Sequence, residues 1–330
     1  MRLRGTCWVI TDHAAGNQRQ ALALAGYWDM PKRHLILAPR PPWSWLAPRL
    51  VQGGRLALEP AQRAMLAPPW PQVAVGCGRQ AALFTRLLRR WSAGTCHTVQ
   101  ILDPRANPAH WDTVIAPRHD RLHGANVLAT LGSLNPIDDA WLLAARAAWP
   151  ALGALPRPRV GVLLGGPRKG IALDADYARR LMHDVITRQR ASGGSVLVVA
   201  SRRTPAALVA AVRPLLENVP GLVWAGATDG ANPYPGILGW ADELVVTPDS
   251  VNMLSEACAV GCPVRTVVTA PLPPRIARFH QALAAADLIA TDADAPPPPH
   301  APLRETATVA ATVAVRIHGV RANAVPGRLR

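Results

Sequence analysis

The sequence predicts an α/β protein with two parallel-sheet domains, and three observations support that prediction. Short apolar, β-branched runs alternate with helical stretches, as is typical of strand–helix–strand units. The alternation stops at residues 151–159, a stretch that reads as a linker, and then begins again. Polar or glycine-rich loops follow most expected strands, where open parallel sheets bind ligands. We therefore expect domains at 1–152 and 153–302, and a helix within 303–330 that can pack back on the first domain.

In the first half, β-branched runs bounded by Gly, Pro or Asp indicate strands, and apolar residues at helical spacing indicate helices. Asn135 is expected to cap the last of these helices, with Pro136 in its first turn. Residues 39–48 carry Trp43 and Trp45 and read as an extended Pro-rich connection, either packed on the domain or forming a flap that touches a membrane. Strands are expected at 7–11, 33–37, 72–75, 98–102, 113–115 and 127–130, and helices at 19–28, 80–91 and 137–149.

The second half is organised around residues 242–264, which predict a strand, a loop, a helix and a stop. An apolar run forms the strand and Pro248 ends it. Asp249 or Ser250 can cap the helix, and Gly261 suits the left-handed position after its last turn. The other expected strands cover 160–164, 196–200, 222–225 and 263–268, and the other helices cover 174–191, 234–241, 275–286 and 303–318, with a further helix after a cap at Thr204.

Four loops of the second half follow expected parallel strands and should open on one edge of one sheet. Their contents suit a nucleotide diphosphate: glycines allow close approach to the backbone, arginines bind phosphate in a bidentate manner, and a helix N-terminus favours anions. A helical carboxylate could bind the ribose diol. The alternative is that Ser250 is only a cap and Glu256 only a solvated helix residue. The predicted donor-binding residues are Gly165, Gly166, Lys169, Ser201, Arg202, Arg203, Thr204, Asn232, Tyr234, Asp249, Ser250, Ser255 and Glu256.

The loops of the first half supply candidates for acceptor binding and for general base catalysis. The loop at 12–18 is not GxGxxG, but its small polar residues could line an acceptor site or form an ordinary tight turn. A His beside an Asp suits a base and its orienting group, or simply a loop hydrogen-bond anchor. The acceptor candidates are Gly16, Asn17 and Gln18. The catalytic candidates are His119 as the leading base, His13 as the second and Asp120 as the orienting group.

The composition and charge of the chain limit the classes of partner that we expect. The formal net charge of +15 favours an anionic partner, either a phosphorylated small molecule or an anionic membrane face. No RNA-binding aromatic signature or zinc pattern is present, so we expect no specific nucleic acid. The five Cys lack CxxC spacing and suggest buried free thiols. With no signal peptide and no apolar run of about 20 residues, we expect a cytoplasmic protein that can lie peripherally on the inner face of a membrane.

Several strings resemble the Elm-type mitochondrial fission family: Gly165-Gly166, Ser-Arg-Arg-Thr-Pro at 201–205, Asn-Pro-Tyr at 232–234, Trp-Ala-Asp at 240–242 and the stretch 247–264. Segments 8–20, 101–105 and 117–120 also fit. Bacterial members look like GT-B glycosyltransferases. The resemblance therefore implies two facing Rossmann-like domains with an interdomain cleft, a nucleotide-sugar site in the second domain and an acceptor site in the first. Arg168, Lys169 and the Pro-rich insert at 41–45 depart from the family pattern.

Ser255-Glu256 is similar to the Ser-Glu pair of GT-B transferases that make lipid-linked peptidoglycan precursor, where that Glu holds the nucleotide ribose. We therefore expect a metal-independent glycosyltransferase with a nucleotide-diphosphate sugar as substrate, no cofactor, and a lipid-linked or envelope glycan as acceptor. The Asp-x-Asp at 292–294 lies beside a Pro spacer at 296–299, outside any strand-end loop. The alternatives are a non-catalytic GT-B-like scaffold, implied by the fission namesake, and an epimerase or phosphatase relative on the same fold.

Overall fold

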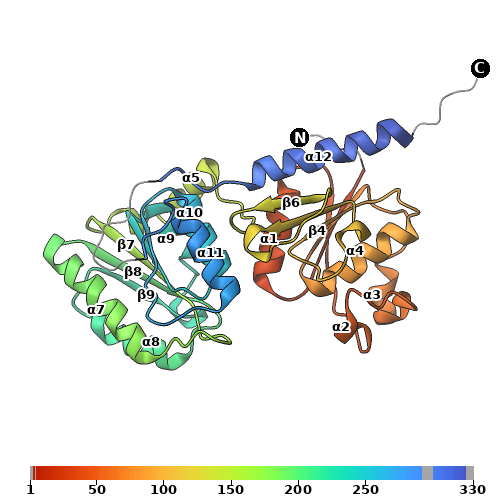
Figure 1. The fold of residues 1–330 in the computed structure, drawn as a ribbon. Coiled ribbons are helices and arrows are strands. Elements are labelled where there is room, and N and C mark those ends of the chain that lie inside the picture. The colour runs from red at the N-terminus through yellow and green to blue at the C-terminus, as the bar shows by residue number, and fades with distance from the viewer. Residues whose placement is uncertain (1–2, 4, 292–299, 325–330) are drawn as a thin grey trace, which may run out of the picture. The chain divides into compact units, whose positions relative to one another are not determined.

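A computed structural model of the chain describes residues 3, 5–291 and 300–324, and these form two compact α/β units (Figure 1). The first unit runs to Pro136 and resumes at Glu305, and the second covers the residues between. The predicted α/β class with parallel sheets is confirmed. The Asp-x-Asp at 292–294 and the spacer at 296–299 lie outside the described residues.

The first unit contains a six-stranded parallel sheet in the order β2-β1-β3-β4-β5-β6. Alternate strand residues face two different helical layers, as a parallel sheet covered on both faces requires. Val9 and Val75 pack with α1 and α12, and Ile10 and Ala74 pack with α4. The strands are β1 (Cys7–Thr11), β2 (Lys32–Ile36), β3 (Val73–Cys77), β4 (His97–Ile101), β5 (Thr113–Pro117) and β6 (Val127–Thr130). The helices are α1 (Ala15–Gly26), α2 (Trp43–Leu46), α3 (Pro60–Ala64), α4 (Arg79–Trp91) and α12 (Thr306–Ala324), with 3-10 turns η1 (Gly54–Ala57), η2 (Pro108–His110) and η3 (Arg118–Asp120).

The helix α12 belongs to the first unit, as expected. Val313 and Ile317 lie in the same core cluster as Leu24 of α1. The indole Nε1 of Trp28 donates a hydrogen bond to the carbonyl of Ala310 at 3.1 Å. Figure 1 shows α12 lying along the sheet of this unit.

The second unit contains a five-stranded parallel sheet in the order β11-β10-β7-β8-β9. The strands are β7 (Arg159–Leu164), β8 (Ser195–Ala200), β9 (Gly221–Trp224), β10 (Glu243–Val246) and β11 (Val264–Arg265). The helices are α5 (Asp139–Ala148), α6 (Pro150–Gly153), α7 (Ala175–Ser192), α8 (Ala206–Val212), α9 (Tyr234–Trp240), α10 (Val251–Val260) and α11 (Pro274–Ala284), with 3-10 turns η4 (Arg213–Leu216) and η5 (Ala227–Asp229). The last strand is shorter than predicted.

The division between the units falls before α5, whereas the sequence-based division falls after it. The helix α5 buries Leu142 and Ala145, and its Arg146 donates a hydrogen bond to the carbonyl of Gly239 in α9 at 2.5 Å. The predicted linker at 151–159 consequently lies inside the second unit, where its last residue starts β7.

The predicted cap of α5 is wrong. Asp138 is the N-cap, and its carboxylate accepts a hydrogen bond from the Trp141 amide at 2.7 Å. Asn135 is engaged elsewhere, because its amide and carbonyl both bond the hydroxyl of Thr306, at 3.0 and 2.8 Å. Asn135, which the sequence pattern assigns to the cap of α5, therefore bonds the start of α12 instead.

The Pro-rich connection is also not fully extended, because α2 forms within it. The indole of Trp43 donates a hydrogen bond to the carbonyl of Gln52 at 2.9 Å, so this residue packs on the unit. Trp45 is 72% exposed. No helix among the described residues is both long and apolar enough to cross a membrane.

The cysteines are free thiols, as predicted. Four of them are buried, and Cys262 is partly exposed. Burial raises the pKa of Cys7 to about 12, so this thiol stays protonated and serves as a small apolar core residue.

Candidate functional site

The predicted donor loops lie together at the carboxyl edge of the second sheet. The chain order reverses between β10 and β7, which pair in parallel, and β8 and β9 follow on the other side of β7. Such a reversal is the usual ligand-binding point of an open α/β sheet. The expectation that all four loops open on one edge is confirmed.

Asp249 joins three of these loops through one buried carboxylate. Its Oδ1 accepts a hydrogen bond from the Thr247 hydroxyl at 2.7 Å, and its Oδ2 accepts one from the Gly166 amide at 3.3 Å. The guanidinium of Arg203 bonds the same Oδ2 at 2.6 Å. The Asp249 side chain is fully buried and that of Arg203 is 46% exposed, so one charge inside the edge is balanced by one at its surface.

The two glycines after β7 make this arrangement possible. A Cβ on Gly165 would lie 1.9 Å from Oδ1 of Asp249, and a Cβ on Gly166 would lie 2.0 Å from the carbonyl oxygen of Arg203. The sequence pattern predicts that these glycines let a ligand approach the backbone closely. In the structure, the space beside each is taken by the protein's own neighbouring loops.

Thr204 links two loops and does not cap α8. Its hydroxyl lies 2.7 Å from the carbonyl oxygen of Gly165 and accepts a hydrogen bond from the Ser201 amide at 2.9 Å. The N-cap of α8 is Pro205, which has no side-chain cap. The predicted cap is therefore wrong, because the hydroxyl points back to the end of β7. Ser201 supports the same loop, since its hydroxyl accepts a hydrogen bond from the Arg203 amide at 3.2 Å.

The start of α10 matches its prediction. Ser250 is the N-cap and accepts a hydrogen bond from the Met253 amide at 3.3 Å, and Gly261 ends the helix in the left-handed conformation. Asn232 accepts a hydrogen bond from the Tyr234 amide at 3.0 Å, which shapes the loop that leads into α9. Lys169 and Arg202 are exposed on neighbouring loops of the same edge.

Sequence reasoning missed two residues that hold the start of α10. Arg168 donates a hydrogen bond to the Asp249 carbonyl at 2.9 Å, although the sequence marks it only as a departure from the family pattern. Burial and the neighbouring Arg203 lower the pKa of Arg168. The imidazole of His280 on α11 donates a hydrogen bond to the Pro248 carbonyl at 3.0 Å. No local signal could have found His280, because it lies 32 residues from its partner.

Glu256 is a buried carboxylate, not a solvated helix residue. It is 2% exposed, and its Oε2 accepts a hydrogen bond from the hydroxyl of Tyr234 in α9. Ser255 is also buried and donates a hydrogen bond to the Val251 carbonyl at 2.7 Å. A buried carboxyl group needs hydrogen-bond donors, and the Tyr234 hydroxyl supplies one to Glu256.

Asp12 organises the corresponding turn of the first unit, where α1 begins at Ala15 and not at residue 19 as predicted, so Gly16, Asn17 and Gln18 lie in the helix and not in a loop. Both carboxylate oxygens accept hydrogen bonds from the Asn17 amide side chain at 3.0 Å, and Oδ1 also accepts one from the Ala14 amide at 2.9 Å. Gln18 donates to the Asp12 carbonyl at 3.0 Å. A Cβ on Gly78 after β3 would lie 2.5 Å from Asn17 Nδ2, so two neighbouring loops meet here.

The first unit separates the two candidate bases. His13 is exposed after β1, whereas His119 is buried in η3 after β5, with its Nε2 3.6 Å from Oδ1 of Asp120. Strands β3 and β4 lie between β1 and β5, which places the two loops about 14 Å apart at the usual strand spacing. His13 lies in the loop beside the β1/β3 chain reversal and Gly16 lies in the first turn of α1 that follows it, whereas His119 lies in neither. No group of three His, Cys, Asp or Glu within the described residues could hold a metal ion.

Solved structures of similar fold include a UDP-GlcNAc 2-epimerase and the plant protein Os79. The UDP-GlcNAc 2-epimerase of Methanocaldococcus jannaschii matches 95% of this chain and 100% of its own, with a TM-score of 0.55 and 11% identity. Os79 from O. sativa, solved in complex with U2F and trichothecene, matches 96% of this chain and 92% of its own, with a TM-score of 0.51 and 13% identity. The two parallel-sheet units therefore define a GT-B-like α/β protein.

The chain belongs to the Mitochondrial fission ELM1 family, which it matches over residues 15–317, as its sequence strings predict. Mitochondrial fission protein ELM1 of Arabidopsis thaliana is 34% identical over 238 residues, which cover 64% of this chain and 55% of that protein. The chain therefore spans about half the length of this curated relative.

Proposed function

We propose that the protein is a metal-independent GT-B glycosyltransferase that binds a nucleotide-diphosphate sugar at the carboxyl edge of the second sheet. The observation that carries this proposal is the buried Glu256 on α10, held by Tyr234 from the neighbouring α9. A carboxylate fixed in this way can accept two hydrogen bonds from a ribose diol. Proteins of similar fold are named for UDP-sugar chemistry, so UDP-N-acetylglucosamine is the first donor to test.

The diphosphate would lie at the beginning of α10. A helix N-terminus offers amide donors and positive partial charge, and Arg168, Lys169 and Arg202 stand on neighbouring loops. Asp249 already balances Arg203, so the remaining cations are the ones available to an anion. As the sugar leaves the nucleotide, negative charge develops on the diphosphate, and these groups would stabilise it without a metal ion.

The acceptor would bind at the first unit, beside the start of α1, which carries Gly16, Asn17 and Gln18. If the reaction inverts the anomeric centre, a base must remove the proton of the acceptor hydroxyl. His13 and His119, with Asp120 as its neighbour, are the proposed candidates, and His13 is the exposed one. The charge of +15 fits a lipid-linked or envelope glycan acceptor at an anionic membrane face.

Thermal unfolding against a panel of nucleoside diphosphates and their sugars tests the donor site. A ligand at about 100 times its Kd stabilises the native state by about 2.7 kcal/mol. We expect one nucleotide series to stabilise the wild type and to have a much weaker effect on Glu256→Gln. Glu217→Gln, at an exposed glutamate of the same unit, is the matched control and should respond like the wild type. No response of the wild type to any nucleotide would refute the proposed donor site.

The second candidate function is a non-catalytic scaffold, favoured by the fission name of the Arabidopsis relative. A scaffold needs its interaction surface but not the carboxylate of Glu256. If the protein is a scaffold, the Glu256→Gln variant should restore its cellular role when it is expressed in a cell that lacks the wild-type gene. A transferase should lose that role in the same variant, together with glycosyl transfer.

A further inference from the structure

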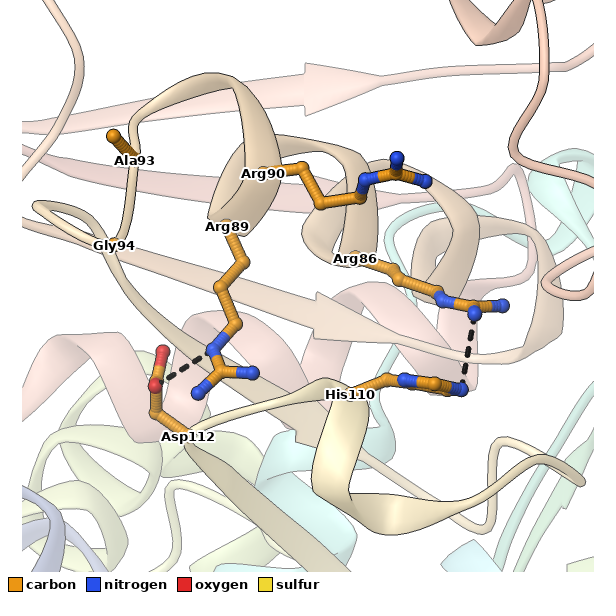
Figure 2. Close-up of a pocket in the computed structure, with 7 residues that line it drawn as sticks. All are labelled: Arg86, Arg89, Arg90, Ala93, Gly94, His110 and Asp112. Carbon is orange, nitrogen blue, oxygen red and sulfur yellow. Dashed lines mark hydrogen bonds and ion pairs between the residues drawn. The ribbon is translucent and has the colours of Figure 1, made fainter.

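A cavity rich in arginine lies in the first unit, away from every residue assigned above. It has a volume of about 740 Å³ and is formed by the last turns of α4, the loop after it and η2 (Figure 2). Its lining residues are Arg86, Arg89, Arg90, Ala93, Gly94, His110 and Asp112.

The carboxylate in the cavity is fully engaged. Oδ1 of Asp112 accepts a hydrogen bond from Nε of Arg89 at 2.8 Å. Oδ2 accepts hydrogen bonds from the amide and the hydroxyl of Thr98, at 2.8 and 2.9 Å. Asp112 therefore balances Arg89, and Figure 2 shows its carboxylate bonded to that arginine of the three.

Arg86 bonds only neutral groups. Its NH1 donates to the Pro48 carbonyl at 2.9 Å, and its NH2 lies 2.9 Å from Nε2 of His110. A guanidinium can only donate, so Nε2 must accept and the imidazole is neutral. Arg90 is exposed and makes no hydrogen bond or ion pair to any described residue. Two positive charges in the cavity consequently lack a carboxylate partner.

The ionisation of the group agrees with this charge count. Burial and the charge of Arg90 lower the pKa of Arg86. Burial, Arg86 and Arg89 lower the pKa of His110. Each of these cations therefore disfavours the protonation of its neighbours, and a bound anion would relieve that repulsion. A helix C-terminus also favours basic residues, which accounts for Arg89 and Arg90 in the last turn of α4 but not for Arg86.

We propose that the cavity of Arg86, Arg89, Arg90 and His110 binds a phosphate monoester, through guanidinium N–H groups that the protein leaves unused. Arginine suits this anion because its planar N–H groups match two phosphate oxygens. The group could belong to a soluble phosphorylated metabolite or to the headgroup of phosphatidic acid, which present the same chemistry. This site is independent of the proposed donor site, because the two lie in different units.

The test uses the whole protein and two probes. Glycerol 3-phosphate in isothermal titration represents the soluble source. Sedimentation with phosphatidylcholine vesicles, with and without a minor fraction of phosphatidic acid, represents the lipid source. Arg90→Ala is the main variant, since its side chain supports no described contact. Arg180→Ala is the matched control, because Arg180 is an exposed helical arginine without a described partner in the second unit.

We expect the wild type to bind at least one probe, and Arg90→Ala to weaken that binding about tenfold, as the loss of one charge-assisted contact implies. Arg180→Ala should bind like the wild type. Binding of glycerol 3-phosphate would identify a soluble ligand, and binding to phosphatidic acid vesicles alone would identify a lipid headgroup. The proposal is overturned if the wild type binds neither probe, or if both variants weaken binding equally, which would indicate only the general basic charge of the chain. Nucleotide stabilisation should be the same in Arg90→Ala and wild type.

Discussion

The two units present the same kind of sheet edge at a chain reversal but hold it together in different ways. In the second unit, the buried carboxylate of Asp249 joins three loops. In the first unit, Asp12 bonds its own loop and the first turn of α1, and the loop after β3 is met through Asn17 against Gly78. A buried shared charge fixes several loops at once. The second edge is therefore shaped before any ligand arrives, whereas the loops of the first edge can change one at a time.

The sharpest test of this comparison is Gly166→Ala. The new Cβ would lie 2.0 Å from a backbone oxygen, so we expect the second unit to lose about 2–3 kcal/mol of unfolding free energy. Gly226→Ala, at a glycine of the same edge with open space around its Cβ, should change it by less than about 0.5 kcal/mol. Hydrogen exchange of the β7 and β8 amides in urea would report on this unit alone. Equal effects of the two substitutions would contradict the close packing at Gly166.

Removing the shared charge should have the next largest effect. Asp249→Ala leaves the Gly166 amide without its acceptor and leaves the Thr247 hydroxyl only the longer bond to the Leu163 carbonyl at 3.4 Å. We expect a loss of about 2 kcal/mol in the second unit, reduced by the partial exposure of Arg203. Asp12→Ala in the first unit should cost about 1 kcal/mol. Urea unfolding followed by amide exchange measures both. Equal losses would mean that the two edges are held equally, and the comparison would fail.

Tyr234→Phe removes the hydroxyl that donates a hydrogen bond to the Glu256 carboxylate. We expect a loss of about 1 kcal/mol in stability and a weaker response to nucleotides. Tyr177→Phe is a suitable control, because the Tyr177 hydroxyl bonds the Val267 carbonyl at 2.9 Å. Its stability should fall by a similar amount while nucleotide binding remains. Thermal unfolding with and without nucleotide reads out both quantities.

The smallest effect concerns pH. Burial lowers the pKa of His280 below its ordinary value of 6.5, although the Pro248 carbonyl opposes this shift. The unfolded chain therefore takes up a proton at a higher pH than the folded unit. The contribution of His280 to stability is complete above about pH 6.5 and is lost as the pH falls through that value. Unfolding free energies at about pH 7.5 and about pH 5.5 should differ less in His280→Gln than in the wild type. His13→Gln, at an exposed loop, should follow the wild type.

Much of the fold could be predicted because it depends on local chemistry. The apolar runs form strands since both faces of each sheet are covered. Ser250 begins α10 because its hydroxyl accepts a hydrogen bond, and Gly261 ends it because glycine has no Cβ to clash in the left-handed conformation. The caps at Asn135 and Thr204 were mispredicted for one shared reason. Each side chain or backbone group is engaged by a segment distant in sequence, which outweighs its local capping preference.

The site could be predicted at the level of loops but not of contacts. Parallel strands place Gly165, Ser201, Asn232 and Ser250 on one edge whatever their side chains do. Which cations are already balanced depends on three-dimensional contacts, such as that between Arg203 and Asp249, 46 residues apart. The cavity on α4 could not be predicted for the same reason. The sequence shows the arginines, but it does not show that two of them have no carboxylate partner.

The position of α12 has a consequence for synthesis of the protein. The core of the first unit needs Val313 and Ile317, and the Trp28 indole bonds a carbonyl 282 residues further along the chain. A ribosome therefore finishes all of the second unit before it releases the helix that completes the first. The second unit can close first, although the first begins earlier, which reverses the usual N-terminal-first order of folding during translation. Until α12 emerges, the apolar face of α1 stays uncovered and is the surface for a chaperone to hold.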